Sequence, residues 1–141
     1  MHIVGIVAEY DPFHNGHKYL IDRAKEETGE KVVCAMSGNF VQRGDTAIFE
    51  KQLRAEAALK CGADLVVEMP VCYSMSTAQS FAKAGVSLLS SIGCDTLMFG
   101  SETGETGPLL KTAQILESEA FSKKLPVYLE QGLTFAKARQ L

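Results

Sequence analysis

The chain has 141 residues, 46% hydrophobic and 22% charged, an ordinary composition for one globular domain with a substantial core. The formal net charge of -3 excludes a globally basic protein, so any RNA would need a local basic face or another domain. The four cysteines form no C-x-x-C pair, and no apolar run approaches the ~20 residues of a membrane span. We therefore expect a soluble, cytoplasmic protein with reduced thiols, of which Cys34, Cys61 and Cys94 are predicted to be buried.

The first predicted element is a buried strand. Residues 3–8 are continuously apolar and mostly β-branched, which is typical of a strand covered on both faces in a parallel sheet. Pro12 ends this strand. Asn15 is a good helix N-cap, and apolar residues at helical spacing predict a helix over residues 16–28 that Gly29 closes.

The junction between this strand and this helix predicts an anion site. A helix that begins at the carboxyl end of a first parallel strand directs unpaired N–H groups and a partial positive charge into the crevice where open α/β sheets bind ligands. His14 and His17 flank the helix start, and Gly16 has no side chain to keep a phosphate from the backbone. Neutral histidine donates one hydrogen bond and protonated histidine adds charge, and near neutrality both forms remain open.

A zinc pair is the alternative interpretation of two nearby histidines. Helical metal pairs normally have a spacing of four and a third ligand elsewhere. Here His14 and His17 are three apart, and the only other histidine is His2 at the chain start. The sequence therefore favours phosphate binding over metal ligation.

Three further strands alternate with helices. Strands are predicted at residues 31–36, 64–69 and 96–100. A polar loop over residues 72–80 leads into a helix that ends at Gly93, with Ser76 or Thr77 as its N-cap. This alternation predicts an open parallel α/β sheet with right-handed crossovers and helices on both faces.

A helix is also predicted over residues 48–60. Phe49, Leu53 and Ala57 are apolar at helical spacing. The charged residues of this segment, Arg54 among them, are interpreted as a solvated face. Beyond residue 108 the chain is helical in character, with an interruption predicted at Pro126.

Loops at the predicted carboxyl edge of the sheet leave alternatives open. Arg43, in the loop 37–45, is either a clamp for a carboxylate or phosphate or an ordinary surface arginine. Glu68 either projects into the crevice or caps neighbouring backbone. Gly100 favours a base or ribose lying against the backbone over a simple turn glycine.

The residues of several segments resemble one family. His14-Asn15-Gly16-His17 resembles the H-x-G-H signature of the nucleotidyltransferase superfamily. The longer segment 5–17, together with residues 36–44, 64–70 and 99–102, resembles the bacterial tRNA(Met) cytidine acetate ligase family over nearly the whole chain. Asp11 departs from the family pattern, which has Asn there, and adds a negative charge near the predicted phosphates.

This resemblance implies a Rossmann-like HxGH nucleotidyltransferase fold over residues 1–141, an incomplete nucleotide-binding domain that ends before its last elements and before any tRNA-binding domain. It implies an ATP-dependent ligase that activates acetate as acetyl-adenylate and acetylates N4 of the wobble cytidine of elongator tRNA(Met), with Mg²⁺ accompanying ATP and no metal ligand from the protein. His14 and His17 would act catalytically at the phosphates, and residues 7–10 with Gly100 would hold the nucleoside. The full implied ATP-binding set is Val7, Ala8, Glu9, Tyr10, Asp11, Pro12, Phe13, His14, Asn15, Gly16, His17, Lys18, Tyr19, Leu20 and Gly100.

Two other functions remain open. The H-x-G-H quartet alone also fits an adenylyl- or cytidylyltransferase that acts on a phosphorylated small molecule. A non-catalytic nucleotide- or RNA-binding module fits as well, because no second phosphate-binding signature rich in Ser, Thr and a basic residue occurs before Leu141. The loop 37–44 and the extended segment before the quartet favour the ligase.

Overall fold

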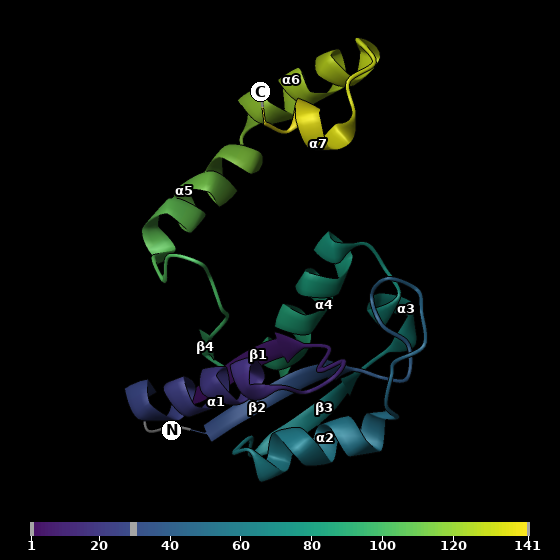
Figure 1. The fold of residues 1–141 in the computed structure, drawn as a ribbon. Coiled ribbons are helices and arrows are strands. Elements are labelled where there is room, and N and C mark those ends of the chain that lie inside the picture. Colours follow the sequence, from purple (N-terminus) through teal and green to yellow (C-terminus); the bar gives the residue numbers. More distant parts are fainter. Residues whose placement is uncertain (1, 29–30, 141) are drawn as a thin grey trace. The chain divides into compact units, whose positions relative to one another are not determined.

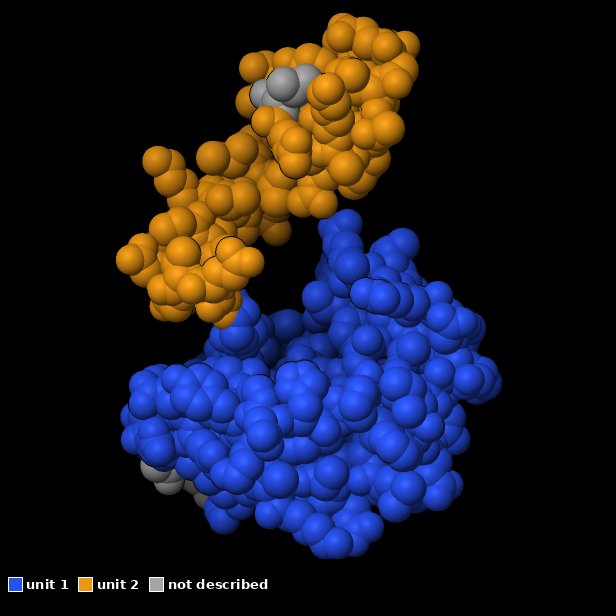
Figure 2. All heavy atoms as spheres, viewed as in Figure 1, with its two compact units in different colours: residues 1–100 blue, residues 101–141 orange. Residues whose placement is uncertain are grey.

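The computed structural model describes residues 2–28 and 31–140. It divides the chain into two compact units, Met1–Gly100 and Ser101–Leu141 (Figure 2). Unit 1 contains a parallel sheet, and unit 2 is helical. The assignment of residues 1–141 to one nucleotide-binding domain stays a prediction, and the two units are described separately below.

Four parallel strands form the sheet of unit 1 (Figure 1). Their order is β3-β2-β1-β4, and their bounds are β1 Ile3–Ala8, β2 Lys31–Ser37, β3 Leu65–Met69 and β4 Thr96–Leu97. The predicted open parallel sheet is confirmed. The fourth strand was predicted over 96–100 and is shorter, because β4 lies at the edge of the sheet with β1 as its partner.

Helices cover both faces of the sheet, as predicted (Figure 1). On one face, α1 (Asn15–Thr28) and α2 (Lys51–Lys60) supply Ile21, Ala24 and Ala58 to a buried cluster with β1 and β2. On the other face, Leu89 of α4 (Ala78–Ser91) packs with Val33 and Ala35 of β2. Successive strand residues alternate between the two faces because the side-chain period of a strand is two.

Two glycines allow α4 to approach β1 closely. A Cβ atom at Gly5 would lie 2.8 Å from Leu89 Cδ1, and one at Gly85 would lie 2.6 Å from Val7 Cγ1. Real side chains essentially never come this close. Gly5 and Gly85 therefore fix the spacing between this helix and the strand that carries the candidate site.

Asp64 holds the amino ends of the strands. Its carboxylate accepts a hydrogen bond from Val32 N at 3.0 Å and pairs with Lys31 Nζ at 2.9 Å and Lys25 Nζ at 3.1 Å. Burial acts to raise the pKa of Asp64, but these hydrogen bonds and charges outweigh it and lower the pKa to about 2. Because Asp64 caps the neighbouring strand, β3 begins at Leu65 and not at Asp64 as predicted.

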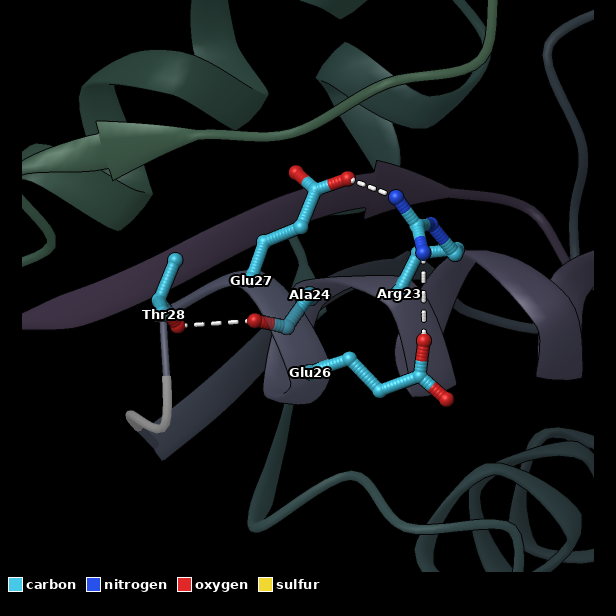
Figure 3. Close-up of polar contacts among 5 residues, drawn as sticks. All are labelled: Arg23, Ala24, Glu26, Glu27 and Thr28. Carbon is cyan, nitrogen blue, oxygen red and sulfur yellow. Dashed lines mark hydrogen bonds and ion pairs between the residues drawn. The ribbon is translucent and has the colours of Figure 1, made fainter.

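The last turns of α1 carry their own polar contacts (Figure 3). Arg23 pairs with Glu26 at 3.2 Å and also with Glu27, and the Thr28 hydroxyl donates to Ala24 O at 2.7 Å. The predicted helix end at Gly29 lies outside the described residues. Within them, the prediction of this helix is confirmed.

Two boundaries differ from the sequence prediction. The helix predicted over 48–60 begins at Lys51, whose N–H is bonded by the Asn39 side chain at 2.9 Å. The segment 72–80, predicted as a loop, contains the short helix α3 (Val71–Ser74), which starts after Pro70 because proline suits the start of a helix. Of the two predicted N-caps for α4, the structure has Thr77, which accepts from Ser80 N.

Unit 2 contains α5 (Thr106–Leu116), α6 (Glu119–Glu130) and α7 (Phe135–Ala138). The predicted interruption at Pro126 is wrong, because Pro126 lies inside α6. The break falls at Ser118, whose side chain accepts a hydrogen bond from Phe121 N at 3.2 Å and caps the new helix. The local capping bond, and not the missing proline N–H, sets this boundary.

The four cysteines are free, but their burial is only partly as predicted. Cys34 is buried, Cys61 and Cys94 are half-buried and Cys72 is exposed. Cys61 and Cys94 each follow the last residue of a helical segment or its glycine turn, where the side chain is only partly covered. Among the described residues, no helix is long and apolar enough to cross a membrane.

Candidate functional site

The candidate site lies where β1 passes into α1. Tyr10 is 1% exposed and has a φ of 54°, a left-handed conformation that directs the chain away from the strand. Its hydroxyl donates to Cys34 Sγ at 3.1 Å. Its ring makes edge contacts with Phe13 and His17, each at 4.9 Å between centroids. Tyr10 therefore forms the buried base on which the exposed part of the site rests.

His14 and His17 form a stacked pair above this base. Their ring centroids are 3.7 Å apart, with 24° between the ring planes. His14 Nδ1 accepts from Gly16 N at 3.1 Å, and His17 Nδ1 accepts from His14 N at 3.2 Å. A nitrogen that accepts carries no proton, so each neutral ring has its proton on Nε2. Both rings thus have an Nε2–H group that no backbone bond occupies.

The start of α1 differs from the prediction. Asn15 was predicted as the N-cap, but the capping bonds belong to His14. The His14 carbonyl accepts from His17 N and Lys18 N, at 2.9 and 3.1 Å, and the His14 ring accepts from Gly16 N. A histidine ring can replace the usual short polar cap because its Nδ1 lies at a similar reach from the backbone. These three N–H groups are bonded within the helix turn, so the imidazoles are the better candidates for anion donors than the predicted unpaired N–H groups.

Gly16 is needed here because the His14 ring covers it. A Cβ atom at position 16 would lie 2.9 Å from His14 Cε1 and 3.1 Å from His14 Nδ1. The sequence interpretation was that glycine keeps the backbone open to a phosphate. In the structure, glycine first makes room for the capping imidazole.

Burial shapes the protonation of this cluster. Burial, and then the neighbouring His14, lower the pKa of His17 below its usual 6.5. Burial also raises the pKa of the Cys34 thiol to about 11 and raises the pKa of Tyr10. His17, Tyr10 and Cys34 are therefore all neutral near pH 7, which leaves the neutral form of His17 of the two that the sequence left open.

The other predicted ATP-binding residues divide into packed and exposed groups. Ala8, Phe13 and Leu20 pack against the buried cluster, and Val7 packs toward Gly85. The carboxylate of Glu9 accepts from Gln42 N, and that of Asp11 accepts from Ile48 N at 2.7 Å. Lys18 pairs with Asp22 at 2.5 Å. The exposed members are Pro12, His14, Asn15, Gly16, Lys18, Tyr19 and Gly100.

Within residues 2–28 and 31–140, no hydrogen bond joins Gly100 to the histidine pair, but the topology brings it to the same edge of the sheet. It follows β4, which is hydrogen-bonded to β1. A Cβ atom at Gly100 would meet nothing within 4 Å. The backbone there is open, as the predicted nucleoside contact requires.

The structure bears on the two residues with open alternatives. Glu68 Oε2 pairs with Lys51 Nζ at 2.6 Å, and a Cβ atom at Gly38 would lie 2.4 Å from Glu68 Oε1. Glu68 is thus an ion-pair partner of α2, and among the described residues it accepts no backbone hydrogen bond. Arg43 is exposed. Among residues 2–28 and 31–140, no group of three His, Cys, Asp or Glu side chains is placed to hold a metal ion.

Arg54 is the functional candidate that the sequence interpretation missed. It was assigned to a solvated face, but it is 2% exposed. Arg54 and Ala58 form the buried face of α2, whereas Leu53 is 51% exposed. The signal was the pair of alanines at helical spacing, Ala55 and Ala58, on the same face as Arg54, which the larger Phe49 and Leu53 obscured.

The whole chain is similar to known proteins of one family. A family model described as HIGH Nucleotidyl Transferase matches residues 1–141. The chain belongs to this family. Among curated proteins, it is 50% identical over 145 residues to a tRNA(Met) cytidine acetate ligase of Thermoanaerobacter sp. and 46% identical over 144 residues to one of Caldicellulosiruptor saccharolyticus. Each match covers 100% of this chain and 36% of the relative, so the chain spans about a third of the relatives' length.

Solved structures agree with the family assignment. A crystal structure of Thermotoga maritima TmcAL bound with alpha-thio ATP has a TM-score of 0.91 and 40% sequence identity, covering 99% of this chain and 34% of that one. The apo form of TmcAL gives the same TM-score at 39% identity. The resemblance and the nucleotidyltransferase fold predicted from the sequence are confirmed.

Proposed function

We propose that the chain is the nucleotide-binding part of an ATP-dependent ligase that acetylates N4 of the wobble cytidine of elongator tRNA(Met). The observation that carries this proposal is the stacked His14–His17 pair at the carboxyl end of β1, with both Nε2–H groups outside the backbone bonding. The ATP analogue in the TmcAL crystal and the names of the curated relatives support it. The chemistry fits donors that the helix start holds in a fixed position.

The proposed reaction has two steps. In the first, an acetate oxygen attacks the α-phosphorus of ATP, the bond to the β-phosphate oxygen breaks, and pyrophosphate leaves with acetyl-adenylate remaining. In the second, cytidine N4 attacks the acetyl carbonyl, AMP leaves and N4 loses a proton. His14 and His17 donate Nε2–H bonds to phosphate oxygens as negative charge gathers on them, so they contribute by position and electrostatics.

The remaining ATP contacts come from backbone. We assign the nucleoside to the backbone of residues 7–10 and to Gly100, whose open surroundings leave room for a flat group. Mg²⁺ would accompany ATP and supply charge neutralisation at the phosphates.

Acetate and tRNA are the other proposed substrates, and a tRNA substrate agrees with the cytoplasmic location expected from the sequence. The net charge of -3 supplies no general attraction for RNA, so tRNA is assigned mainly to parts of the relatives' length that this chain does not span.

The test is turnover by the full-length protein with acetate, ATP and unmodified tRNA(Met). The proposal predicts N4-acetylcytidine and pyrophosphate, with no product when any one substrate is omitted. Pyrophosphate release with a phosphorylated small acceptor and no tRNA would instead favour another adenylyl- or cytidylyltransferase. ATP binding without turnover on either substrate would favour a non-catalytic nucleotide-binding module.

A further inference from the structure

Arg54 is the only buried charged side chain among the described residues. Its guanidinium donates to three backbone carbonyls: Nη1 to Glu9, Nη2 to Gly38 and Nε to Phe49, the last at 2.9 Å. Glu9 follows β1 and Gly38 follows β2, so the guanidinium lies at the carboxyl edge of the sheet. It also lines a cavity of about 260 Å³ with Pro12 and Phe13, the residues just before His14.

No ion pair among the described residues neutralises the charge of Arg54. Within residues 2–28 and 31–140, no carboxylate forms a salt bridge with it. Burial lowers the pKa of Arg54, while the negative charges of Asp11, Glu9 and Glu68 act in the opposite direction. An arginine guanidinium stays protonated under such conditions.

The three carboxylates that act on Arg54 are fixed by other partners. Glu9 accepts from Gln42 N, Asp11 accepts from Ile48 N, and Glu68 pairs with Lys51. Glu9 and Asp11 lie between β1 and His14, and among the described residues neither forms an ion pair. Without a buried cation, their two charges would oppose the binding of a polyphosphate.

We propose that Arg54 is a positioning residue whose buried charge allows the β1–α1 junction to accept an anionic nucleotide without touching it. This inference rests on the proposed ATP site. No neutral side chain has donors for all three carbonyls, so the guanidinium that bonds them also brings a buried positive charge to this edge. That charge offsets Glu9 and Asp11, whereas Glu68 is already paired with Lys51.

The test compares ligands of different charge in the full-length protein. Affinities for ATP and adenosine are measured by calorimetry for wild type, Arg54→Met and Arg54→Lys. For Arg54→Met we expect the ratio of ATP to adenosine affinity to fall about tenfold, the scale of losing one charge in a partly screened site. Arg54→Lys keeps the charge, so its ratio stays near the wild-type value even where both affinities decline because the fork of donors is lost.

The matched control is Lys60→Met, which removes an exposed cation of the same helix whose partner is Glu56 at 2.7 Å. Its ratio should not change. If Arg54→Met does not fold, Arg54→Gln keeps two amide donors for the carbonyls and carries the same expectation. Asp11→Asn removes one of the negative charges that Arg54 offsets and keeps the acceptor for Ile48 N. It should therefore raise the ratio of ATP to adenosine affinity.

An unchanged ratio of ATP to adenosine affinity in the neutral variants, whether both affinities fall equally or neither falls, would overturn the inference and leave Arg54 a purely structural residue. This result is distinct from failure of the proposed function, in which wild type itself binds no ATP and the inference falls with it.

Discussion

His14 and His17 each present the same nitrogen outward, because backbone N–H groups bond both Nδ1 atoms. We expect each ring, in its neutral form, to be the Nε2–H tautomer, and long-range ¹H–¹⁵N spectra of the imidazoles measure this. His2 is the internal control, since its Nδ1 lies 2.5 Å from Asp95 Oδ2 and must carry a proton to bond it. A protonated Nδ1 on His14 or His17 would contradict the proposed donor geometry.

The lowered pKa of His17 also predicts the direction in which the stability of the fold changes with pH. Because the folded state holds its proton less tightly than the unfolded chain, His17 contributes stability that is complete above the unfolded pKa of 6.5 and is lost as the pH falls below it. Unfolding midpoints in denaturant from pH 7.5 down to about 5 should decline less in His17→Gln than in wild type. An equal decline in both proteins would show that titration of His17 does not cause the loss of stability at low pH.

Removal of one imidazole should slow the reaction without unfolding the protein. For His17→Ala in the full-length enzyme we expect a loss of at least ~2 kcal/mol of transition-state stabilisation in kcat/KM, by analogy with deletion of one oxyanion donor. His2→Ala, which removes an exposed histidine whose partner is Asp95, should leave the rate unchanged. A wild-type rate for His17→Ala would remove His17 from the catalytic machinery.

The pair of histidines could be predicted from the sequence, but the hydrogen bonds that their rings accept from backbone N–H groups could not. The spacing of His14 and His17 around Gly16 indicated an anion site at a helix start. The capping role of His14 depends on a side-chain rotamer, and that rotamer follows from stacking on His17, which packs in turn against Tyr10 and Phe13. Sequence pattern therefore favoured Asn15, the statistically common cap, over the residue that forms the bond.

At the scale of elements, the approach of α4 to β1 should be sensitive to one methyl group. Gly85→Ala places a Cβ against both Val7 methyls, at 2.6 and 2.7 Å, and we expect it to reduce the free energy of unfolding by about 1–3 kcal/mol. The measurement is equilibrium denaturant unfolding. Gly107→Ala is the matched control, because Gly107 is also helical but has no neighbour within 4 Å, so it should be neutral or slightly stabilising. Equal stability of the two variants would show that this contact does not limit the packing.

Asp64 should make the amino ends of the strands acid-sensitive. Its pKa is depressed from 3.8 to about 2, so its contribution to stability is complete above 3.8 and is lost as the pH falls toward 2. Asp64→Asn keeps an acceptor for Val32 N but does not titrate. Between pH 5 and pH 2.5 we expect the thermal midpoint of wild type to fall further than that of Asp64→Asn, while parallel curves would contradict the role of the Asp64 charge.

The orientation of α2 shows where sequence prediction of an element fails. Its position in the chain could be predicted within three residues, but Phe49 and Leu53, the expected inner face, are 50% and 51% exposed. The helix instead turns Arg54 and Ala58 inward, because three carbonyls at the ends of β1, β2 and the preceding loop need donors. That demand arises from the tertiary structure and has no signature in a hydrophobic pattern.

At the scale of the whole molecule, the sheet could be predicted because each strand is a short apolar run between turn residues and crossovers between parallel strands have one hand. The two compact units were not predicted, although residues 100–108 contain three glycines and a proline, a composition typical of loops between elements. Gly100 is the last residue of unit 1. Its place beside the β1–α1 junction follows from the pairing of β4 with β1 and not from a sequence motif.

The central claim is that the phosphates of ATP bind at the His14–His17 pair, and calorimetric titration of the full-length protein with ATP and Mg²⁺ tests it most directly. We predict that wild type and His2→Ala bind alike, and that His14→Ala and His17→Ala each lose about tenfold in affinity, the value of one hydrogen bond to a charged group. All four proteins should give the same far-UV circular dichroism. Wild-type affinity in both His14→Ala and His17→Ala would contradict the claim and place the phosphates elsewhere.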